Sequence, residues 1–249
     1  RRFFLLIWVA FAPPVMLAAP ASRPPNLIFI LADDLGYGDI GPYGSTLNRT
    51  PHLDQLAKES RKFTHLYAAA NVCTPSRAGL MTGIHPRRLN LHVSSRSTTV
   101  LQPGEPIGLN PAEIPLAEVL RGAGYATMLI GKWHLGGQRD VGEAPLISEY
   151  GFDASLTNFE GLGPRVLPLL NARDGSEPRR HALGSDSLGR GEITWADRDE
   201  VTTRFASAAL GFIRQAAKGG KPFYVNLWPD DVHSPFFPPA ARRGDGAKR

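Results

Sequence analysis

The chain has 249 residues, of which 42% are hydrophobic and 20% charged, a composition typical of a globular protein with a substantial core. Its length allows one large domain or two small ones. The formal net charge of +5 arises from the two ends of the chain, and no basic segment is interleaved with aromatic residues, which excludes nucleic-acid binding as the expected function.

Residues 1–21 have the organisation of a secretory signal peptide. Two arginines precede an apolar run over residues 3–19, and APA at 19–21 supplies the small residues of a signal-peptidase site. Two prolines interrupt the run, which is already short for a membrane span. We predict a cleaved leader and a secreted or periplasmic protein with no stable membrane span after cleavage; a retained lipid or helical anchor is the alternative.

A continuous apolar run over residues 26–32 predicts the first strand. Such a run is expected of a strand that is covered on both faces of a parallel sheet. It ends in Asp33 and Asp34. Two adjacent carboxylates after a strand commonly form only a solvated loop or a helix cap, but they are also hard oxygen ligands that suit Ca²⁺ or Mg²⁺.

A helix and a short return strand are expected next. Thr50 is a candidate N-cap before Pro51 at the first helical position, and apolar residues recur behind them at helical spacing. Residues 63–67 are then a candidate short strand.

Cys73 is the only cysteine in the chain. A lone thiol forms no internal disulfide, and in an exported protein it calls for a chemical explanation; the common alternative is a buried cysteine that acts as a small hydrophobe. Pro75 suits the first turn of a helix, so Cys73 is expected just ahead of a helix N-terminus, which favours anionic groups. A cysteine hydrolase would use the same position, because it lowers the pKa of a thiol.

The middle of the chain predicts loops, a helix and a second strand. Residues 84–110 show no clear period and are expected to form loops over the site. A helix is predicted over residues 114–121, ended by glycine, and a strand over residues 125–130. Lys132 and His134 follow this strand, and their spacing points both side chains to the same side of an extended segment.

The last third of the chain predicts a long irregular segment, a helix and a third strand. Residues 155–195 are rich in Gly, Pro and Arg, which predicts an insertion or a substrate loop. An amphipathic helix follows, with an apolar stripe from Val201 to Phe212. It leads to a strand over residues 223–228 and then to His233.

Strands that alternate with helices predict a doubly wound, mainly parallel α/β sheet. Ligands of such sheets bind beyond the carboxyl ends of the strands. The three strongest strand candidates all end there in polar clusters: Asp33 with Asp34, Lys132 with His134, and His233. The three clusters are therefore expected to meet in one site.

Four segments together resemble the type I sulfatase family. Residues 25–39 read PNLIFILADDLGYGD, residues 73–83 read CTPSRAGLMTG, residues 131–136 read GKWHLG and residues 231–236 read DVHSPF. The resemblance runs from about residue 25 to residue 239. It implies an alkaline-phosphatase-like α/β sandwich with helices on both faces of the sheet, in which residues 25–249 are the N-terminal part of the catalytic domain.

The resemblance also implies a modified nucleophile and a cation. Cys73 would be oxidised to formylglycine by a formylglycine-generating enzyme during export, and Pro75 and Arg77 would be parts of the motif that this enzyme reads. Asp33, Asp34 and the modified Cys73 would hold a divalent cation, Ca²⁺ or alternatively Mg²⁺.

The reaction that the resemblance implies is hydrolysis of a sulfate monoester, either a sulfated carbohydrate or an aryl sulfate. Arg77 and Lys132 would neutralise negative charge, and His134 would assist collapse of the hemiacetal. His233 would protonate or stabilise the departing oxygen.

Two alternatives stay open, and one part of the family pattern is missing. A phosphomonoester or phosphonate monoester hydrolase of the same superfamily is the nearest alternative, and a catalytically silent carbohydrate-binding relative is the second. The family's further metal ligands and its second lysine have no match in residues 1–249. The sequence therefore predicts a truncated catalytic domain.

Overall fold

The computed structural model describes residues 23–91, 108–136, 144–170, 177–182, 185–187 and 189–233. Its strands are β1 (Leu27–Ile30), β2 (Ala126–Gly131), β3 (Ala154–Thr157), β4 (Arg165–Leu170), β5 (Arg179–Arg180), β6 (Ile193–Asp197) and β7 (Phe223–Trp228). Its α-helices are α1 (Pro51–Glu59), α2 (Cys73–Thr82), α3 (Leu116–Gly122) and α4 (Val201–Lys218). Short 3-10 helices are η1 (Tyr37–Asp39), η2 (Gly41–Tyr43), η3 (Pro86–Leu89), η4 (Ile147–Tyr150), η5 (Ser185–Ser187) and η6 (Arg198–Glu200). The predicted leader lies outside the described residues.

The three strands that the sequence predicted most clearly, β1, β2 and β7, are parallel neighbours in the sheet. The sheet order is β1-β7-β2-β3-β4-β5, and β6 pairs with the outer side of β4. Leu27 lies opposite Tyr224 of β7, and Thr127 of β2 lies opposite the same residue on the other side. Only β5 runs antiparallel to its partner among the described strands. The prediction of a mainly parallel α/β sheet is therefore confirmed.

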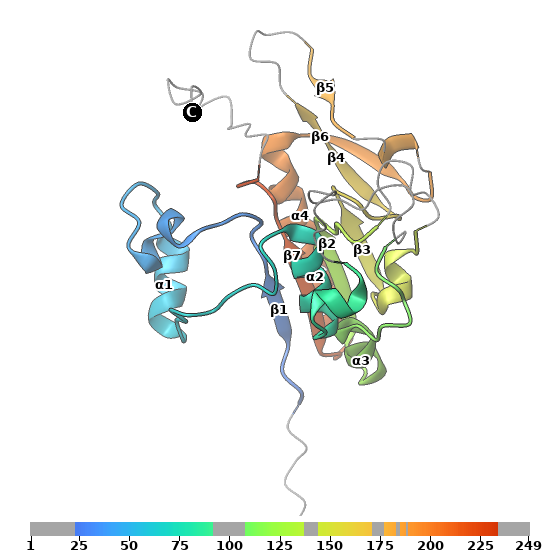
Figure 1. Ribbon diagram of the computed structural model, residues 1–249, viewed down its shortest axis with the longest axis horizontal. Coiled ribbons are helices and arrows are strands. Elements are labelled where there is room, and N and C mark those ends of the chain that lie inside the picture. The colour runs from blue at the N-terminus through green and yellow to red at the C-terminus, as the bar shows by residue number, and fades with distance from the viewer. Residues whose placement is uncertain are drawn as a thin grey trace, which may run out of the picture.

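Helices cover both faces of this sheet, as Figure 1 shows, and the side chains of its central strands alternate between them. Leu129 of β2 and Tyr224 of β7 pack on the face covered by α2 and α3. Their neighbours Ile130 and Val225 pack on the opposite face against α4, whose Phe205 is fully buried. This period of two is what a strand buried on both faces requires.

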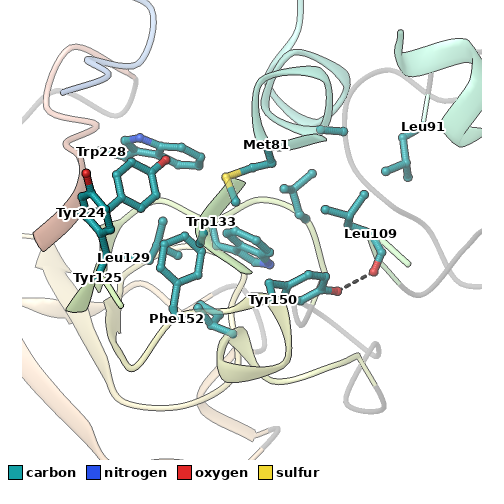
Figure 2. Close-up of a cluster of buried hydrophobic side chains, with 14 residues drawn as sticks. Met81, Leu91, Leu109, Tyr125, Leu129, Trp133, Tyr150, Phe152, Tyr224 and Trp228 are labelled. Atoms are coloured by element: carbon teal, nitrogen blue, oxygen red, sulfur yellow. Dashed lines mark hydrogen bonds between the residues drawn. The ribbon is translucent and has the colours of Figure 1, made fainter. Parts of the chain in front are cut away.

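An aromatic cluster fills the space between the sheet and α2 and α3 (Figure 2). Trp133 lies against Tyr150 with ring centroids 5.0 Å apart, and the Tyr150 hydroxyl donates a hydrogen bond to the carbonyl of Leu109. Met81 brings α2 into the same cluster. The packing of α2 matters for the site because this helix begins at Cys73.

The interpretation of residues 155–195 as an insertion or substrate loop was wrong. The segment carries the last three residues of β3, all of β4 and β5, and the start of β6. Its strands are short and separated by glycine turns, and Pro168 interrupts the apolar run of β4, so no period was visible. Pro168 has no backbone N–H to donate, and its carbonyl accepts a hydrogen bond of 3.0 Å from the backbone N–H of His181.

Two further expectations near the first strand were also wrong. β1 was expected to be covered on both faces, but Ile28 and Ile30 are 53% and 61% exposed, because β1 pairs with β7 alone among the described strands. Residues 63–67 form an exposed segment without strand pairing, whose Phe63 carbonyl accepts a hydrogen bond from the hydroxyl of Tyr43.

The predicted helices are confirmed with small shifts of their ends. α1 begins at Pro51 as expected. α4 begins at Val201, where the predicted apolar stripe begins, and continues beyond the stripe to Lys218. α3 begins two residues later than predicted, at Leu116. Of the loops expected over residues 84–110, residues 92–107 lie outside the described part of the chain.

Gly131 allows β2 and β7 to approach each other at the point where the site begins. Its φ is +108°, and a Cβ atom there would lie 2.1 Å from the carbonyl oxygen of Trp228. The same carbonyl accepts a hydrogen bond of 3.0 Å from the backbone N–H of Lys132. A side chain at position 131 would therefore displace the backbone that carries Lys132.

We predict that Gly131→Ala destabilises the fold by about 2 kcal/mol or more, because it combines a disfavoured φ with a backbone clash. Gly211→Ala is the matched control. Gly211 lies in α4, and nothing lies within 4 Å of its added Cβ, so this change should stabilise by about 0.5 to 1 kcal/mol. Denaturant unfolding of both variants measures the difference, and equal stabilities would contradict the described approach of β2 and β7.

Candidate active site

Cys73 is the first residue of α2. The sequence predicted it just ahead of the helix, so the helix begins slightly earlier than expected. Val72 precedes it with extended backbone, and the helix ends at Gly83 in the left-handed conformation. Thr74 fixes the start of the helix over the sheet, since its hydroxyl donates a hydrogen bond of 3.0 Å to the carbonyl of His134. The half-buried thiol therefore stands at the carboxyl edge of the parallel strands.

Arg77 lies one turn further along α2 and joins three parts of the site. It is 1% exposed. Its Nη1 donates to the carbonyl of Lys132 at 2.7 Å, and its Nη2 donates to Oδ1 of Asp33 at 2.8 Å. The guanidinium lies 4.9 Å from the ring centroid of Trp228. Arg77 thus links α2 to the ends of β1, β2 and β7.

Lys132 occupies the other oxygen of the same carboxylate. Its Nζ lies 2.5 Å from Oδ2 of Asp33 and 3.4 Å from Sγ of Cys73. It also lies 4.9 Å from the ring centroid of Phe159. Cys73 Sγ donates to Asp33 Oδ2 at 3.8 Å. The thiol, the carboxylate and the ammonium group therefore form one buried cluster.

Burial and nearby charges shift the pKa values of Asp33 and Cys73 in opposite directions. Burial raises the pKa of Asp33, but the charges of Arg77 and Lys132 outweigh it and bring the value to about 2. Burial raises the pKa of the Cys73 thiol, and Asp33 adds to this increase against the opposing charge of Lys132. At neutral pH Asp33 is an anion, while Cys73 is a thiol and not a thiolate.

His134 is buried beside the cluster with an unusual backbone. Its φ is +56°, and its amide is shared between the carbonyls of Phe159 and Glu160, at 3.3 Å each. Its ring lies 3.8 Å from the carboxylate of Glu160. Burial, followed by the charges of Lys132 and Arg77, holds the pKa of His134 well below its usual value. The ring is therefore neutral at physiological pH, and its contact with Glu160 is not an ion pair.

His233 and Asp34 face each other at the outer side of the cluster. His233 Nε2 lies 3.7 Å from Oδ2 of Asp34, which is 59% exposed. Ligand atoms of Asp33, Cys73 and His233 all lie within 4.8 Å of one another. The residues predicted at the ends of β1, β2 and β7 therefore lie close to one another and to Cys73 at the start of α2.

Asp33 and Asp34 supply carboxylate oxygens, the ligand type that Ca²⁺ and Mg²⁺ prefer, and the ligand atoms that lie close enough to share one ion are those of Asp33, Cys73 and His233. Both oxygens of Asp33 accept hydrogen bonds, from Arg77 and Lys132. A cation would therefore share the Asp33 carboxylate with these two residues, and Cys73 and His233 are the other described residues whose ligand atoms lie close enough to reach it. Ligation by Asp34 stays a prediction from the family resemblance.

Side chains at two further strand ends, which the sequence did not predict, belong to the site. Asn158, Phe159 and Glu160 follow β3. Phe159 contacts both Lys132 and His134, Glu160 lies beside His134, and Asn158 donates a hydrogen bond to Asp230. Arg198 follows β6 and pairs with Asp230, next to His233. Only recognition of β3 and β6 as strands could have assigned these residues to the site.

Comparison with known proteins gives a consistent result. The model of the Sulfatase family matches residues 25–246. Mouse steryl-sulfatase is 46% identical over 184 residues, covering 70% of this chain and 28% of the mouse protein. Pig N-acetylgalactosamine-6-sulfatase is 33% identical over 244 residues, covering 95% of this chain and 44% of the pig protein. The chain thus spans less than half the length of these two relatives.

Solved structures share the fold. Ps i-CgsB in complex with k-i-k-neocarrahexaose superposes with a TM-score of 0.62 at 25% identity, over 86% of this chain and 46% of that one. A sulfatase structure described under the metabolism of multiple glycosaminoglycans by Bacteroides thetaiotaomicron gives a TM-score of 0.62 at 26% identity, over 86% and 52%. The expected α/β fold, with a mainly parallel sheet and helices on both faces, is confirmed. Since the family model covers nearly all of the chain, this chain belongs to the sulfatase family.

Proposed function

We propose that the protein containing this chain hydrolyses sulfate monoesters through a formylglycine made from Cys73, together with a divalent cation. The observation that carries the proposal is the position of the Cys73 thiol, which lies 3.4 Å from Lys132 Nζ and 3.8 Å from Asp33 Oδ2 at the carboxyl edge of the sheet. A group made from this side chain would meet a substrate entering from that edge.

A hydrated aldehyde explains this position better than a thiolate does. A plain cysteine hydrolase needs the thiolate, whereas the pKa of Cys73 is raised. A thiolate would also leave a sulfated enzyme that water must attack against the charge of the sulfate. In the aldehyde hydrate one hydroxyl attacks sulfur and displaces the alcohol. Loss of the proton from the second hydroxyl then re-forms the carbonyl and breaks the carbon–oxygen bond to sulfate.

Two histidines suit the two proton transfers of this reaction. His134 is neutral because burial lowers its pKa, so it can accept the proton of the second hydroxyl. His233 is half-buried at the outer side of the cluster, where it would give a proton to the departing alcohol oxygen. Lys132 would hold the sulfate oxygens near Cys73, and Arg77 would keep Asp33 charged and in place.

Asp33, Asp34 and the modified Cys73 would hold Ca²⁺, with Mg²⁺ as the alternative. When bound, such an ion would polarise the sulfate oxygens. Ca²⁺ takes about six to eight oxygen ligands, and the three residues supply only part of that shell. We therefore propose that the working protein is longer than this chain, a view that the coverage of the relatives supports and the exposed β1 also favours.

The proposed substrate class is a sulfated carbohydrate. The similar structures include a complex with neocarrahexaose and a protein described under glycosaminoglycan metabolism. Steryl-sulfatase and arylsulfatase A are also among the relatives, which makes an aryl sulfate a reasonable assay substrate. A phosphomonoester or phosphonate monoester hydrolase is the alternative, and rates on matched aryl sulfate and aryl phosphate esters separate the two. A silent carbohydrate-binding relative would bind without turnover.

Export and the modifying enzyme complete the proposal. Pro75 and Arg77 are buried in the fold, so a formylglycine-generating enzyme would have to recognise these two residues before the chain folds. The predicted leader at residues 1–21 would take the chain to the periplasm or outside the cell. Within the described residues, no helix is both long and apolar enough to cross a membrane.

We predict that Cys73 is formylglycine when the full-length protein is exported from cells that contain the modifying enzyme. Peptide mass spectrometry across Cys73 measures the conversion, and Arg77→Ala, which removes one of the residues to be read, should lower it. Cys73→Ala should abolish turnover with little change in thermal stability, since its side chain is half-buried at a helix start. Unmodified cysteine alone in the exported protein would contradict the proposal.

We predict that Lys132→Ala and His134→Ala in the full-length protein each lower kcat on an aryl sulfate by about 100-fold or more, the scale for lost electrostatic or acid–base groups. Lys218→Ala is the matched control, because Lys218 is exposed at the end of α4. Steady-state kinetics measure the effect. Rates within a fewfold of the control would exclude both residues from the reaction.

We predict that residues 1–249 alone show no appreciable sulfatase activity, because Asp33, Asp34 and Cys73 leave the coordination of Ca²⁺ incomplete. The exposed β1 should also promote aggregation. The measurement is a calcium titration followed by an aryl sulfate assay, on this chain and on the full-length protein, both carrying formylglycine. Equal calcium affinity and turnover would show that the site is complete within these residues.

A further inference from the structure

Arg198 is a buried charged residue that the proposed reaction does not use. It is the first residue of η6, directly after β6, and is 6% exposed. Its Nη1 donates to Oδ1 of Asp231 at 3.0 Å, and its Nη2 donates to the carbonyl of Asp230 at 2.6 Å. Nη2 also lies 3.2 Å from Oδ1 of Asp230. One guanidinium therefore contacts two residues, Asp230 and Asp231, of the turn that follows β7.

The turn that Arg198 holds is the one that carries His233. The backbone N–H of His233 donates to the carbonyl of Asp230 at 3.0 Å, so this one oxygen accepts from both His233 and Arg198. Asn158, at the end of β3, donates to Oδ1 of Asp230 at 2.8 Å. The carbonyl of Pro229 accepts from the N–H of Asp33 at 3.0 Å. The turn is thus tied to the ends of β1, β3 and β6.

We propose that Arg198 is a positioning residue that fixes His233 for proton transfer to the leaving group. The inference rests on the proposed function, in which His233 is the proton donor. A guanidinium presents its donors in a rigid planar arrangement, and here it binds a carbonyl and two carboxylates at once. A general acid must lie within hydrogen-bond distance of the oxygen it protonates, so a loosened turn would weaken this step in particular.

The burial of the partners indicates which contact matters. The side chain of Asp230 is 14% exposed, whereas that of Asp231 is 48% exposed. An exposed ion pair contributes little, but removing one partner of a buried pair leaves the other charge uncompensated. The contact with Asp230, both carbonyl and carboxylate, is therefore the one that holds the turn. Asp231→Asn should have a small effect, and Arg198→Met a large one.

The test compares two esters that differ in leaving group. The full-length, formylglycine-bearing protein and its Arg198→Met and Arg198→Lys variants are assayed with p-nitrophenyl sulfate, which has a good leaving group, and with phenyl sulfate, which has a poor one. Arg198→Met should lower kcat/KM for phenyl sulfate by about 10- to 100-fold and for p-nitrophenyl sulfate by about threefold or less, because only the poor leaving group needs the acid. Arg198→Lys should fall between wild type and Arg198→Met.

A double-mutant cycle shows whether Arg198 acts through His233. In a His233→Ala background, Arg198→Met should change the phenyl sulfate rate by less than about threefold, because the donor it would position is already absent. Arg204→Met is the matched control. Arg204 is 45% exposed and pairs with Glu200, the residue that precedes α4, so its removal should leave both rates unchanged.

Three results would overturn the assignment: no loss on phenyl sulfate, equal losses on both esters, or a full additional loss in the His233→Ala background. Thermal melting checks that each variant is folded, and Arg198→Lys provides the same comparison if Arg198→Met does not fold. A wild-type protein that releases sulfate from neither ester would instead overturn the proposed function, which the wild-type rates test separately.

Discussion

The carboxylate of Asp33 is the interaction on which the rest of the site depends. Arg77 from α2 binds one of its oxygens at 2.8 Å and Lys132 from the end of β2 binds the other at 2.5 Å. Burial of an isolated carboxylate is unfavourable, and the two cations reverse this effect, as the pKa of about 2 shows. Folding therefore brings α2, β1 and β2 to one point, and Cys73 at the start of α2 is placed there as a consequence.

The same arrangement explains why a free thiol is a poor nucleophile here. The N-terminus of a helix favours an anion, but burial and the adjacent Asp33 carboxylate raise the pKa of Cys73. An aldehyde hydrate carries no charge before it reacts, so it does not need a thiolate-stabilising environment. Lys132, whose Nζ lies 3.4 Å from Cys73 Sγ, would then be available for the sulfate group. This is the physical reason to prefer a modified Cys73 over a cysteine hydrolase.

The sequence predicted the parts of the fold that have a strong local pattern. β1, β2 and β7 are apolar runs that end in polar clusters, and the parallel-strand rule correctly placed Asp33, Lys132 and His233 at one edge. β4 was missed because Pro168 and nearby glycines hide its period. The short β3 was also missed, and Asn158 to Glu160, which follow it, were missed with it. The contribution of Arg198 depends on a tertiary contact with Asp230, which has no signal in the local sequence. Likewise, the exposure of β1 follows from sheet order and not from its composition.

The central claim is that the reacting group at position 73 is a carbonyl and not a thiol. The most direct measurement is sulfate release by the full-length exported protein after treatment with a carbonyl reagent such as phenylhydrazine, or with the thiol reagent iodoacetamide. The account predicts that phenylhydrazine inactivates the protein and that iodoacetamide leaves its activity unchanged. Inactivation by iodoacetamide, with full activity after phenylhydrazine, would contradict it.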